Sequence, residues 1–466
     1  MATWQEYGPE TKAMLALGLP LAGSLVAQVA LGATDTLMMG WYGVPELAAL
    51  TVATSFFFIL FLAVSGFAWA ALPMIAAAAE RGDDQEVRRV TRMGLWLVTA
   101  FGTLCVLPLW FAEPILLAAG QEPEIARLGQ DYLRIACWSI FPQLWIMVLK
   151  SYLSALERTG VVLWATVFAL LPNAAVNYVL IFGNYGAPEM GVRGAAVATL
   201  TVGSLTCALL LAYALRQFPE HAILARVWRP DREIIARVFR LGWPIALTSV
   251  SEVGLFVASA LLMGIIGTVE LAAHGIVLNI ASLTFVVHLG LSQAATVRAG
   301  RAVGRASLVD LARAGKVAVT LSLFFVGVTV AFFLGVPETL VRTFLNPAEA
   351  EFEAVLAMGV FLLAMAALFQ LVDAAQVVAL GLLRGVQDTE VPMYMAAFSY
   401  WVVGLPVAAG LGLWLGLGAF GVWLGLAAGL AVAAALLMYR FWRVSGRRLP
   451  AQAAGTSGEA RPESAG

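Results

Sequence analysis

Two acidic residues interrupt stretches of sequence that are otherwise suited to the interior of a lipid bilayer. Glu252 is the only formally charged residue between positions 241 and 269, and Asp373 lies in an apolar run that ends at Arg384. An acidic side chain at the centre of a membrane-spanning helix costs about 2.5–3.5 kcal/mol on insertion scales. Because such a cost must be offset, we predict that both carboxylates belong to a functional site.

The two carboxylates are predicted to lie at similar depth in the membrane. Glu252 follows Arg240 by 12 residues, and Asp373 precedes Arg384 by 11. At about 1.5 Å per residue, each therefore lies roughly 16–18 Å from a basic residue. Helical spacing places further oxygen-bearing side chains near them, namely Thr248, Ser249, Ser259, Gln370 and Gln376.

Such an oxygen-rich group is typical of a site for a small hard cation. Sodium prefers carboxylate, hydroxyl and carbonyl oxygens by the logic that governs other hard ions. Two carboxylates close together also favour capture of a proton. We therefore predict a coupling-cation site, with sodium as one candidate ion, at Glu252 and Asp373. The alternative is that these residues form structural ion pairs with Arg134 or Lys150.

A second polar group is predicted in the first half of the chain. Asp35 lies in the outer part of the first apolar span, and Asn173 and Asn177 are four residues apart in the fifth, so they share a helix face. Pro172 frees backbone carbonyls, which are tolerated at membrane depth only where they face protein or a cavity. Asp35 could bind an ion directly or join a structural network, and the two amides could instead hold helices together.

The remaining polar residues at membrane depth give weaker signals. His274 and His288 are 14 residues apart and therefore on similar faces of one helix, where they could relay protons. The alternative is that His274 lies near the outer end and is hydrated. Arg134 and Lys150 are predicted to extend toward the two membrane surfaces. Asn279 joins the polar candidates for supporting ion or substrate binding.

The elements that must position these residues are membrane-spanning helices. The chain is 61% hydrophobic and only 12% charged, whereas soluble domains carry about 25% charged residues. Continuous apolar runs, rather than alternating ten-residue segments, exclude an outer-membrane barrel. We predict an all-α polytopic membrane protein with twelve spans near 13–40, 46–79, 93–118, 130–155, 160–183, 191–215, 236–266, 270–297, 314–336, 352–383, 391–415 and 419–441.

The distribution of basic residues predicts the orientation of these spans. If the N-terminus is cytoplasmic, 24 of the 28 Lys and Arg residues fall on the cytoplasmic side or in the inner half of a span. This bias predicts that both termini are cytoplasmic. We expect a multi-pass membrane protein.

The two halves of the sequence repeat at an offset of 224 residues. "LGLPLAG" at Leu17 matches "LGWPIAL" at Leu241, and "MMGWYGVPELAA" matches "LMGIIGTVELAA" without a gap. Six spans per half predict parallel repeats, which suit alternating access. The predicted division is an N-lobe at 1–215, a partly helical cytoplasmic linker at 216–235, a C-lobe at 236–446 and a disordered tail at 447–466.

Signatures of soluble enzymes are missing from the sequence. There is no Walker loop, dinucleotide fingerprint, zinc spacing or nucleophile elbow. The loops are also too short to hold a nucleotide-binding domain. We therefore expect neither an enzyme nor a user of ATP, with no cofactor and no nucleic-acid partner, and we expect a monomer.

The sequence resembles the MATE (multidrug and toxic compound extrusion) family, in its NorM-like bacterial branch, over nearly all of positions 10–445. The resemblance rests on the repeated "MG…G…ELAA", on "TDTLMMG", on "PNAAVNYVLIFG" and on "FQLVDAAQVVALGLLRGVQDTEVP". It implies two six-helix lobes that export cationic amphipathic drugs or dyes in exchange for sodium ions or protons. The family's acidic residues carry over to Asp35, Glu252 and Asp373, and its N-lobe polar cluster to Asp35, Asn173 and Asn177.

One departure and two open choices accompany this resemblance. Similar proteins have Gln after "AAH", where this chain has Gly275, so a polar contact with drug or ion is missing. The pattern does not choose between sodium and protons, or between Asp35 and the Glu252–Asp373 pair as the main coupling site. The alternative function is a lipid-linked-intermediate flippase of the same wider superfamily, which should have several basic residues in its cavity.

Overall fold

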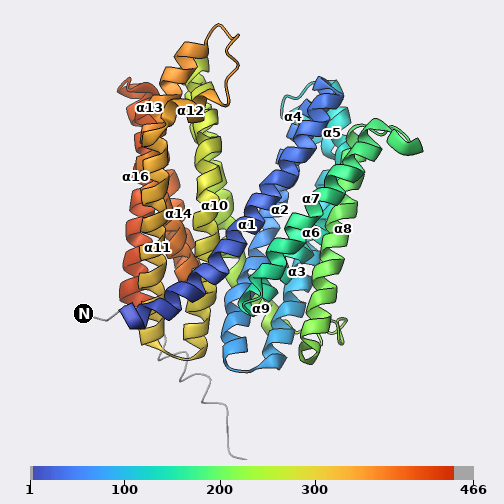
Figure 1. The fold of residues 1–466 in the computed structure, drawn as a ribbon, viewed down its shortest axis with the longest axis vertical. Helices are drawn as coiled ribbons and strands as arrows, with labels where there is room; N and C mark the ends of the chain where they lie inside the picture. Colours follow the sequence, from blue (N-terminus) through green and yellow to red (C-terminus); the bar gives the residue numbers. More distant parts are fainter. Residues whose placement is uncertain (1–3, 446–466) are drawn as a thin grey trace, which may run out of the picture. The chain divides into compact units, whose positions relative to one another are not determined.

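The computed structural model describes residues 4–445, which form helices joined by short loops and contain no strand (Figure 1). The first half contains the helices α1 (Trp4–Tyr42), α2 (Val44–Glu80), α3 (Asp84–Trp110), α4 (Ala112–Ala118), α5 (Pro123–Ala136), α6 (Ile140–Ala155), α7 (Thr159–Phe182) and α8 (Val192–Gln217). The second contains α9 (Arg232–Ile266), α10 (Thr268–Gly304), α11 (Leu308–Gly335), α12 (Pro337–Arg342), α13 (Phe352–Gly385), α14 (Glu390–Ala397), α15 (Leu405–Ala409) and α16 (Gly418–Arg440).

Short 3₁₀-helical and π-helical segments lie between or after these α-helices. The 3₁₀ segments are η1 (Cys137–Ser139), η2 (Asn184–Gly186) and η3 (Pro219–His221). The π-helical segments are η4 (Phe398–Gly404), η5 (Gly410–Trp414) and η6 (Phe441–Ser445). The predicted tail at 447–466 lies outside the described residues.

Twelve helical stretches within residues 4–445 are long and apolar enough to cross a membrane, which confirms the predicted all-α fold with twelve spans. Three of them are composite: α5, η1 and α6 run on as Pro123–Ala155, α14 to η5 as Glu390–Trp414, and α16 with the start of η6 as Gly418–Arg443. The predicted third span at 93–118 is wrong at its C-terminal end. Its helix begins at Asp84 and stops at Trp110, since Phe111 leaves the helical region (φ −106°, ψ 46°) and the separate helix α4 follows.

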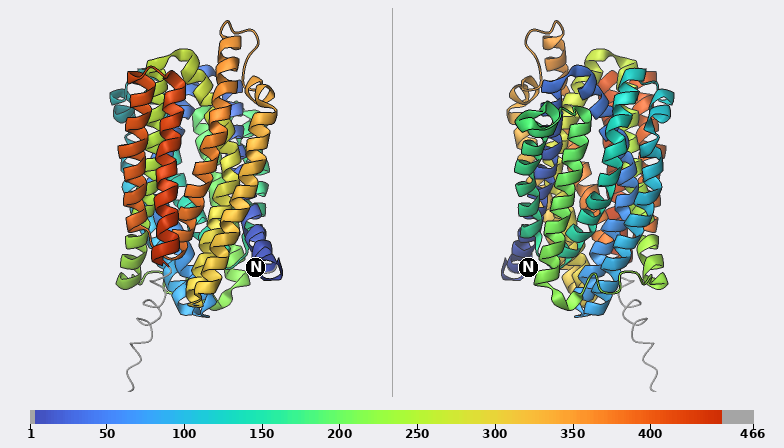
Figure 2. Two further views of the ribbon diagram at one scale, coloured as in Figure 1. Left: turned by 90° about the vertical axis from the view of Figure 1, so that its left-hand side faces the viewer. Right: turned by 90° about the vertical axis from the view of Figure 1, so that its right-hand side faces the viewer.

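The chain divides into two compact units. Unit 1 contains the described residues of Met1–Leu19 and Ser251–Gly466, and unit 2 contains Pro20–Val250. Within each unit the long helices run side by side (Figures 1 and 2). Helices α1 and α9 each contribute one segment to either unit. The predicted lobe and linker bounds at 215 and 236 stay a prediction.

The 224-residue repeat is visible in the local structure of the helix starts. Asp83 accepts a hydrogen bond from the backbone N–H of Glu86 at the start of α3, and Ser307 accepts one from Asp310 at the start of α11. Both residues lie at the N-cap, where a side-chain oxygen satisfies a free helical N–H. An ion pair accompanies each cap, Arg81–Glu86 at 2.6 Å and Arg305–Asp310 at 2.9 Å.

Small residues allow the helices of unit 1 to pack closely. Ser292 and Thr296 of α10 donate hydrogen bonds to the carbonyls of Val377 and Gly381 on α13, at 2.7 and 2.8 Å. Gly421, Gly425 and Gly429 follow one another at four-residue spacing on α16 and face the backbone of the segment from η4 to η5. Such small-residue faces are the usual means by which membrane helices approach each other.

A side chain at Gly425 is expected to destabilise the fold. A Cβ atom there would collide with the backbone of Ala408 on α15, and overpacking a close contact costs about 1–3 kcal/mol. Gly425→Val should therefore lower the thermal unfolding midpoint of the purified protein. Gly327→Val in α11 is the matched control, because nothing lies within 4 Å of its Cβ position. Equal midpoints for the two variants would contradict the packing argument.

The segment between α8 and α9 is fixed to the rest of unit 2 by polar contacts with α3. Asp231 accepts a hydrogen bond from Arg89 Nε at 2.5 Å, and Trp96 Nε1 donates to the carbonyl of Val227 at 2.6 Å. The hydrogen bond from Arg89 holds the pKa of Asp231 below its ordinary value of 3.8. A carboxyl group whose pKa is lower in the folded than in the unfolded state stabilises the folded state at pH values above its unfolded pKa. The stabilisation from this contact is therefore fully present at neutral pH and is lost only as the pH falls below about 4.

Candidate functional site

The two predicted carboxylates meet inside unit 1, in a group that we call the carboxylate cluster: Glu252, Asp373, Gln376 and Tyr400. Glu252 comes from α9, Asp373 and Gln376 from α13, and Tyr400 from η4. Gln376 Nε2 donates to Glu252 Oε1 at 3.4 Å. Glu252 also lies within electrostatic range of Asp373. The structure thus brings Gln376 of α13 against Glu252 of α9, and the predicted role of the two acids in cation coupling stays a prediction.

Three buried polar atoms of the carboxylate cluster have no hydrogen-bond partner among the described residues. They are Asp373 Oδ1, Gln376 Oε1 and the Tyr400 hydroxyl. Asp373 is 3% exposed, and Gln376 and Tyr400 are fully buried. Buried polar groups in proteins are nearly always hydrogen-bonded, and one left alone costs about 1–3 kcal/mol. Three such oxygens beside a second carboxylate form a set that fits a cation or a transferable proton.

Tyr400 is a member of the cluster that the sequence did not reveal. It lies beside Gln376 and within electrostatic range of Glu252 and Asp373. Its segment η4 is π-helical, and π-helical turns are rare and frequent at functional sites. A Tyr among apolar residues carries no formal charge to mark it. The flanking Pro392 and Pro406 were the only local sign of an irregular helix.

Arg384, which served in the sequence analysis only to estimate the depth of Asp373, also affects the electrostatics of the carboxylate cluster. Its charge acts on both Glu252 and Tyr400, although it follows Asp373 by 11 residues on α13. A long side chain reaches several ångströms along its own helix. The positive charge of Arg384 therefore contributes to the field at the carboxylate cluster.

Several predicted supporting residues bond elsewhere. Hydroxyl groups in helices readily bond to a carbonyl one turn earlier, and Ser249 donates to Ile245 O at 3.1 Å. Asn279 donates in the same way to Gly275 O at 2.9 Å. Gln370 donates to Thr284 Oγ1 at 2.5 Å and Ala281 O at 3.3 Å on α10. The remaining two hydroxyls, those of Thr248 and Ser259, donate to Pro244 O and Phe256 O.

The polar residues of unit 2 form a second group, the asparagine cluster: Asp35, Asn173 and Asn177. Asn173 Nδ2 and Asn177 Nδ2 both donate to Asp35 Oδ1, at 3.0 and 2.6 Å. Asp35 is half-buried, whereas both amides are buried. Asn177 Oδ1 has no partner among the described residues. The buried phenol of Tyr132 lies within electrostatic range of Asp35.

The two histidines of α10 are buried separately. His274 Nε2 lies 3.3 Å from Ser259 Oγ, and its ring packs edge-on to Trp423. His288 Nδ1 lies 3.3 Å from Ser322 Oγ. Because His274 is only 1% exposed, the alternative that it is hydrated is wrong. Each histidine bonds to its own serine, so a direct relay between them has no support in this geometry.

The clusters differ from a transition-metal site. Within residues 4–445 no three His, Cys, Asp or Glu side chains are gathered as metal ligands. The carboxylate cluster offers two carboxylates with neutral amide and phenol oxygens, and the asparagine cluster offers one carboxylate with amide oxygens. Such oxygen donors suit hard, weakly held cations.

Comparisons with known proteins agree in the family that they indicate. The MatE family profile matches residues 20–179 and 244–409. A protein of Rhizobium meliloti (strain 1021), named "Probable multidrug resistance protein NorM", is 47% identical over 445 residues, with 95% of each chain covered. A protein of Pseudomonas aeruginosa with the same name is 36% identical over 444 residues, covering 95% of this chain and 91% of its own.

Solved structures share the fold at low sequence identity. The "Crystal structure of eukaryotic MATE transporter AtDTX14" has a TM-score of 0.83 at 20% identity, covering 96% of this chain and 99% of that one. A MOP superfamily transporter from Pyrococcus furiosus has a TM-score of 0.85 at 21% identity, covering 95% and 97%. These likenesses concern the fold alone.

Proposed function

The chain belongs to the MatE family, and we propose from this premise that it is a secondary active multidrug efflux transporter that exports organic cations in antiport with sodium ions or protons. The proposal is carried by one observation, the unpartnered buried oxygens of Asp373, Gln376 and Tyr400 beside Glu252. The coupling cation is substrate here, because it enters and leaves with each cycle. The protein is proposed to lie in a bacterial inner membrane with both termini cytoplasmic.

The carboxylate cluster would hold the coupling cation through oxygen atoms. Asp373 and Glu252 supply negative charge, and the side chains of Gln376 and Tyr400 supply neutral oxygens. When sodium leaves, a proton taken up by one carboxylate would keep the two negative charges from facing each other unscreened. In either form the cluster offsets the cost of placing acids at membrane depth.

Coupling to export requires that ion and drug favour different states of the transporter. A ligand shifts a conformational equilibrium only by its difference in affinity for the two states. Exchange of one monovalent ion for one monovalent organic cation moves no net charge, so the concentration gradient of the ion drives it. Each further monovalent cation that enters down 100 mV releases about 2.3 kcal/mol, which supports an additional concentration ratio of roughly fifty-fold. Alternating access, with ion and organic cation favouring opposite-facing states, would convert this release into export.

The proposal is tested with purified protein reconstituted into vesicles preloaded with a fluorescent organic cation. A sodium jump and an acid jump are imposed separately across the membrane, and dye release is followed in each. We expect one of the jumps to drive release from the wild type and thereby to name the ion. If neither jump moves the dye with folded protein, organic cations are the wrong substrate, and the lipid-linked-intermediate flippase becomes the leading function.

Removing the Tyr400 hydroxyl is expected to weaken coupling without abolishing it. Tyr400→Phe keeps the buried ring but deletes one oxygen of the carboxylate cluster, and a hydrogen bond or dipole directed at a charged group contributes about 1.5–3 kcal/mol. We expect the ion concentration for half-maximal dye release to rise about tenfold. Tyr394→Phe is the matched control, because Tyr394 is 59% exposed on the neighbouring α14. An unchanged ion dependence in Tyr400→Phe would remove Tyr400 from the site.

A further inference from the structure

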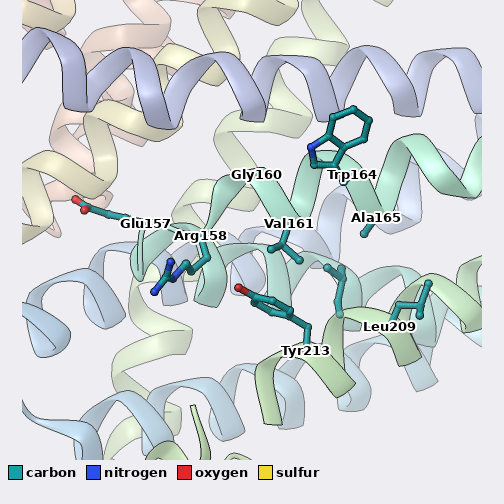
Figure 3. Close-up of a pocket in the computed structure, with 9 residues that line it drawn as sticks. Glu157, Arg158, Gly160, Val161, Trp164, Ala165, Leu209 and Tyr213 are labelled. Atoms are coloured by element: carbon teal, nitrogen blue, oxygen red, sulfur yellow. The ribbon is translucent and has the colours of Figure 1, made fainter. Parts of the chain in front are cut away.

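An open groove lies between α7 and α8 of unit 2, apart from both polar clusters. It has a volume of about 540 Å³, within the range of roughly 300–1,000 Å³ that small-molecule sites occupy. Its walls are mainly apolar and include Val161, Ala165 and Leu209. Figure 3 shows these side chains along the groove, with Arg158 and Tyr213 at one end.

The polar end of the groove carries positive charge with no partner. The side chain of Arg158 is exposed and makes no hydrogen bond or ion pair among the described residues. In Figure 3 its guanidinium and the Tyr213 hydroxyl lie near each other, whereas the Glu157 carboxylate points away from both. Arg216 lies one turn beyond Tyr213 at the same end of α8, and it too has no ion pair within residues 4–445.

The tight turn between α6 and α7 fixes Arg158 at this end. Glu157 adopts a left-handed backbone conformation (φ 60°), and the backbone N–H of Arg158 bonds to Leu153 O at 2.8 Å. Arg158 then precedes the first residue of α7, so its side chain leaves the turn beside the groove. The position of the guanidinium thus follows from the backbone.

The surroundings of the groove are suited to lipid. Leu209 is 51% exposed and Trp164, on the same helix as Val161, is 58% exposed, and both lie on helices long enough to cross the membrane. Trp and Tyr gather at the levels where lipid headgroups meet hydrocarbon. Basic pockets between membrane helices bind the headgroups of anionic lipids.

We propose that this groove binds one anionic phospholipid. Its phosphate would lie between the Arg158 guanidinium and the Tyr213 hydroxyl, and part of one acyl chain would lie along Val161, Ala165 and Leu209. A zwitterionic lipid carries a compensating ammonium group that gains nothing from Arg216, so the net positive charge at this end selects a net negative headgroup. The inference is independent of the transported substrate.

Native mass spectrometry of the full-length protein tests the site, with phosphatidylglycerol and phosphatidylcholine titrated separately. We expect the wild type to bind one phosphatidylglycerol more tightly than phosphatidylcholine. Arg158→Gln should weaken phosphatidylglycerol binding about tenfold, and it should weaken phosphatidylcholine binding as well, because both lipids carry the phosphate that Arg158 would contact. Ala165→Phe, which fills the groove, should weaken both lipids.

Arg127→Gln is the matched control. Arg127 is exposed near the start of α5 and makes no ion pair within residues 4–445. It lies at the opposite end of the span Pro123–Ala155 from Arg158. Retained binding in this variant together with loss in Arg158→Gln supports the proposal. Equal losses in the two arginine variants would assign the preference to diffuse surface charge and overturn it. Unchanged phosphatidylglycerol binding in folded Ala165→Phe would also overturn it. Thermal unfolding midpoints establish that each variant is folded.

Discussion

Ion-driven export is expected to fall at least about 30-fold when Glu252 is replaced by Gln, while the protein still inserts and folds. The substitution keeps size and an acceptor oxygen, so the contact from Gln376 Nε2 at 3.4 Å can persist. It removes the charge that faces a bound cation, and losing one partner of a buried charge interaction costs about 2–5 kcal/mol, where 1.4 kcal/mol is tenfold. Dye release after an ion jump measures the loss.

The matched control for this variant is Glu353→Gln. Glu353 lies in the first turn of α13, the helix that carries Asp373, and it is exposed. The same change of charge there should leave export within about twofold of the wild type, because exposed charges contribute little. If Glu252→Gln transports as well as Glu353→Gln, the carboxylate cluster has no part in coupling.

The two acids of the cluster should also act as one unit. Asp373→Asn is expected to lose export as Glu252→Gln does, and the double variant should be little worse than either single variant. Residues that share one bound ion are strongly non-additive, because the first substitution already removes the ion. Additive losses would indicate two separate roles for Glu252 and Asp373.

The helices and their repeat could be predicted from the sequence because both depend on local properties. Apolar runs of sufficient length span a membrane whatever their partners are. The 224-residue offset predicted equivalent positions, and Asp83 and Ser307 do cap equivalent helices. Glu46 and Glu270 are also equivalent positions of the repeat, and they behave alike in the structure. Each carboxylate folds back over the glycine that precedes its helix.

The composition of each polar cluster could be predicted only in part. Helical spacing correctly paired Asn173 with Asn177, and charge at membrane depth identified Glu252 and Asp373. Spacing does not show which faces of different helices meet. It placed Ser249 near Glu252, and in the structure the Ser249 hydroxyl donates to Ile245 O. The position of Tyr400 in the cluster depends on a π-helical segment. Such a segment changes which residues share a helix face, and the periodicity of apolar residues does not reveal it.

Replacing Asp35 by Asn is the second change with a large expected effect. Asp35 Oδ1 receives both amide donors, Asn173 Nδ2 and Asn177 Nδ2, which leaves Asp35 Oδ2 and the unpartnered Asn177 Oδ1 for a cation or a proton. The substitution removes the only carboxylate of the asparagine cluster but keeps an acceptor for the amides. If this cluster takes part in coupling, export should fall about 10- to 100-fold, for a loss of about 1.4–2.8 kcal/mol.

The control for Asp35→Asn is Asp131→Asn, which breaks a surface ion pair with Arg193 at 3.0 Å in the same unit. Exposed ion pairs contribute about 0–1 kcal/mol, so this variant should export almost normally. The comparison with Glu252→Gln then assigns the coupling ion to a cluster. If Asp35→Asn alone changes the steepness with which release depends on ion concentration, the main site is the asparagine cluster. If only Glu252→Gln changes this steepness, Asp35 serves to hold α1 against α7 through the hydrogen bonds that it accepts from the two asparagine amides.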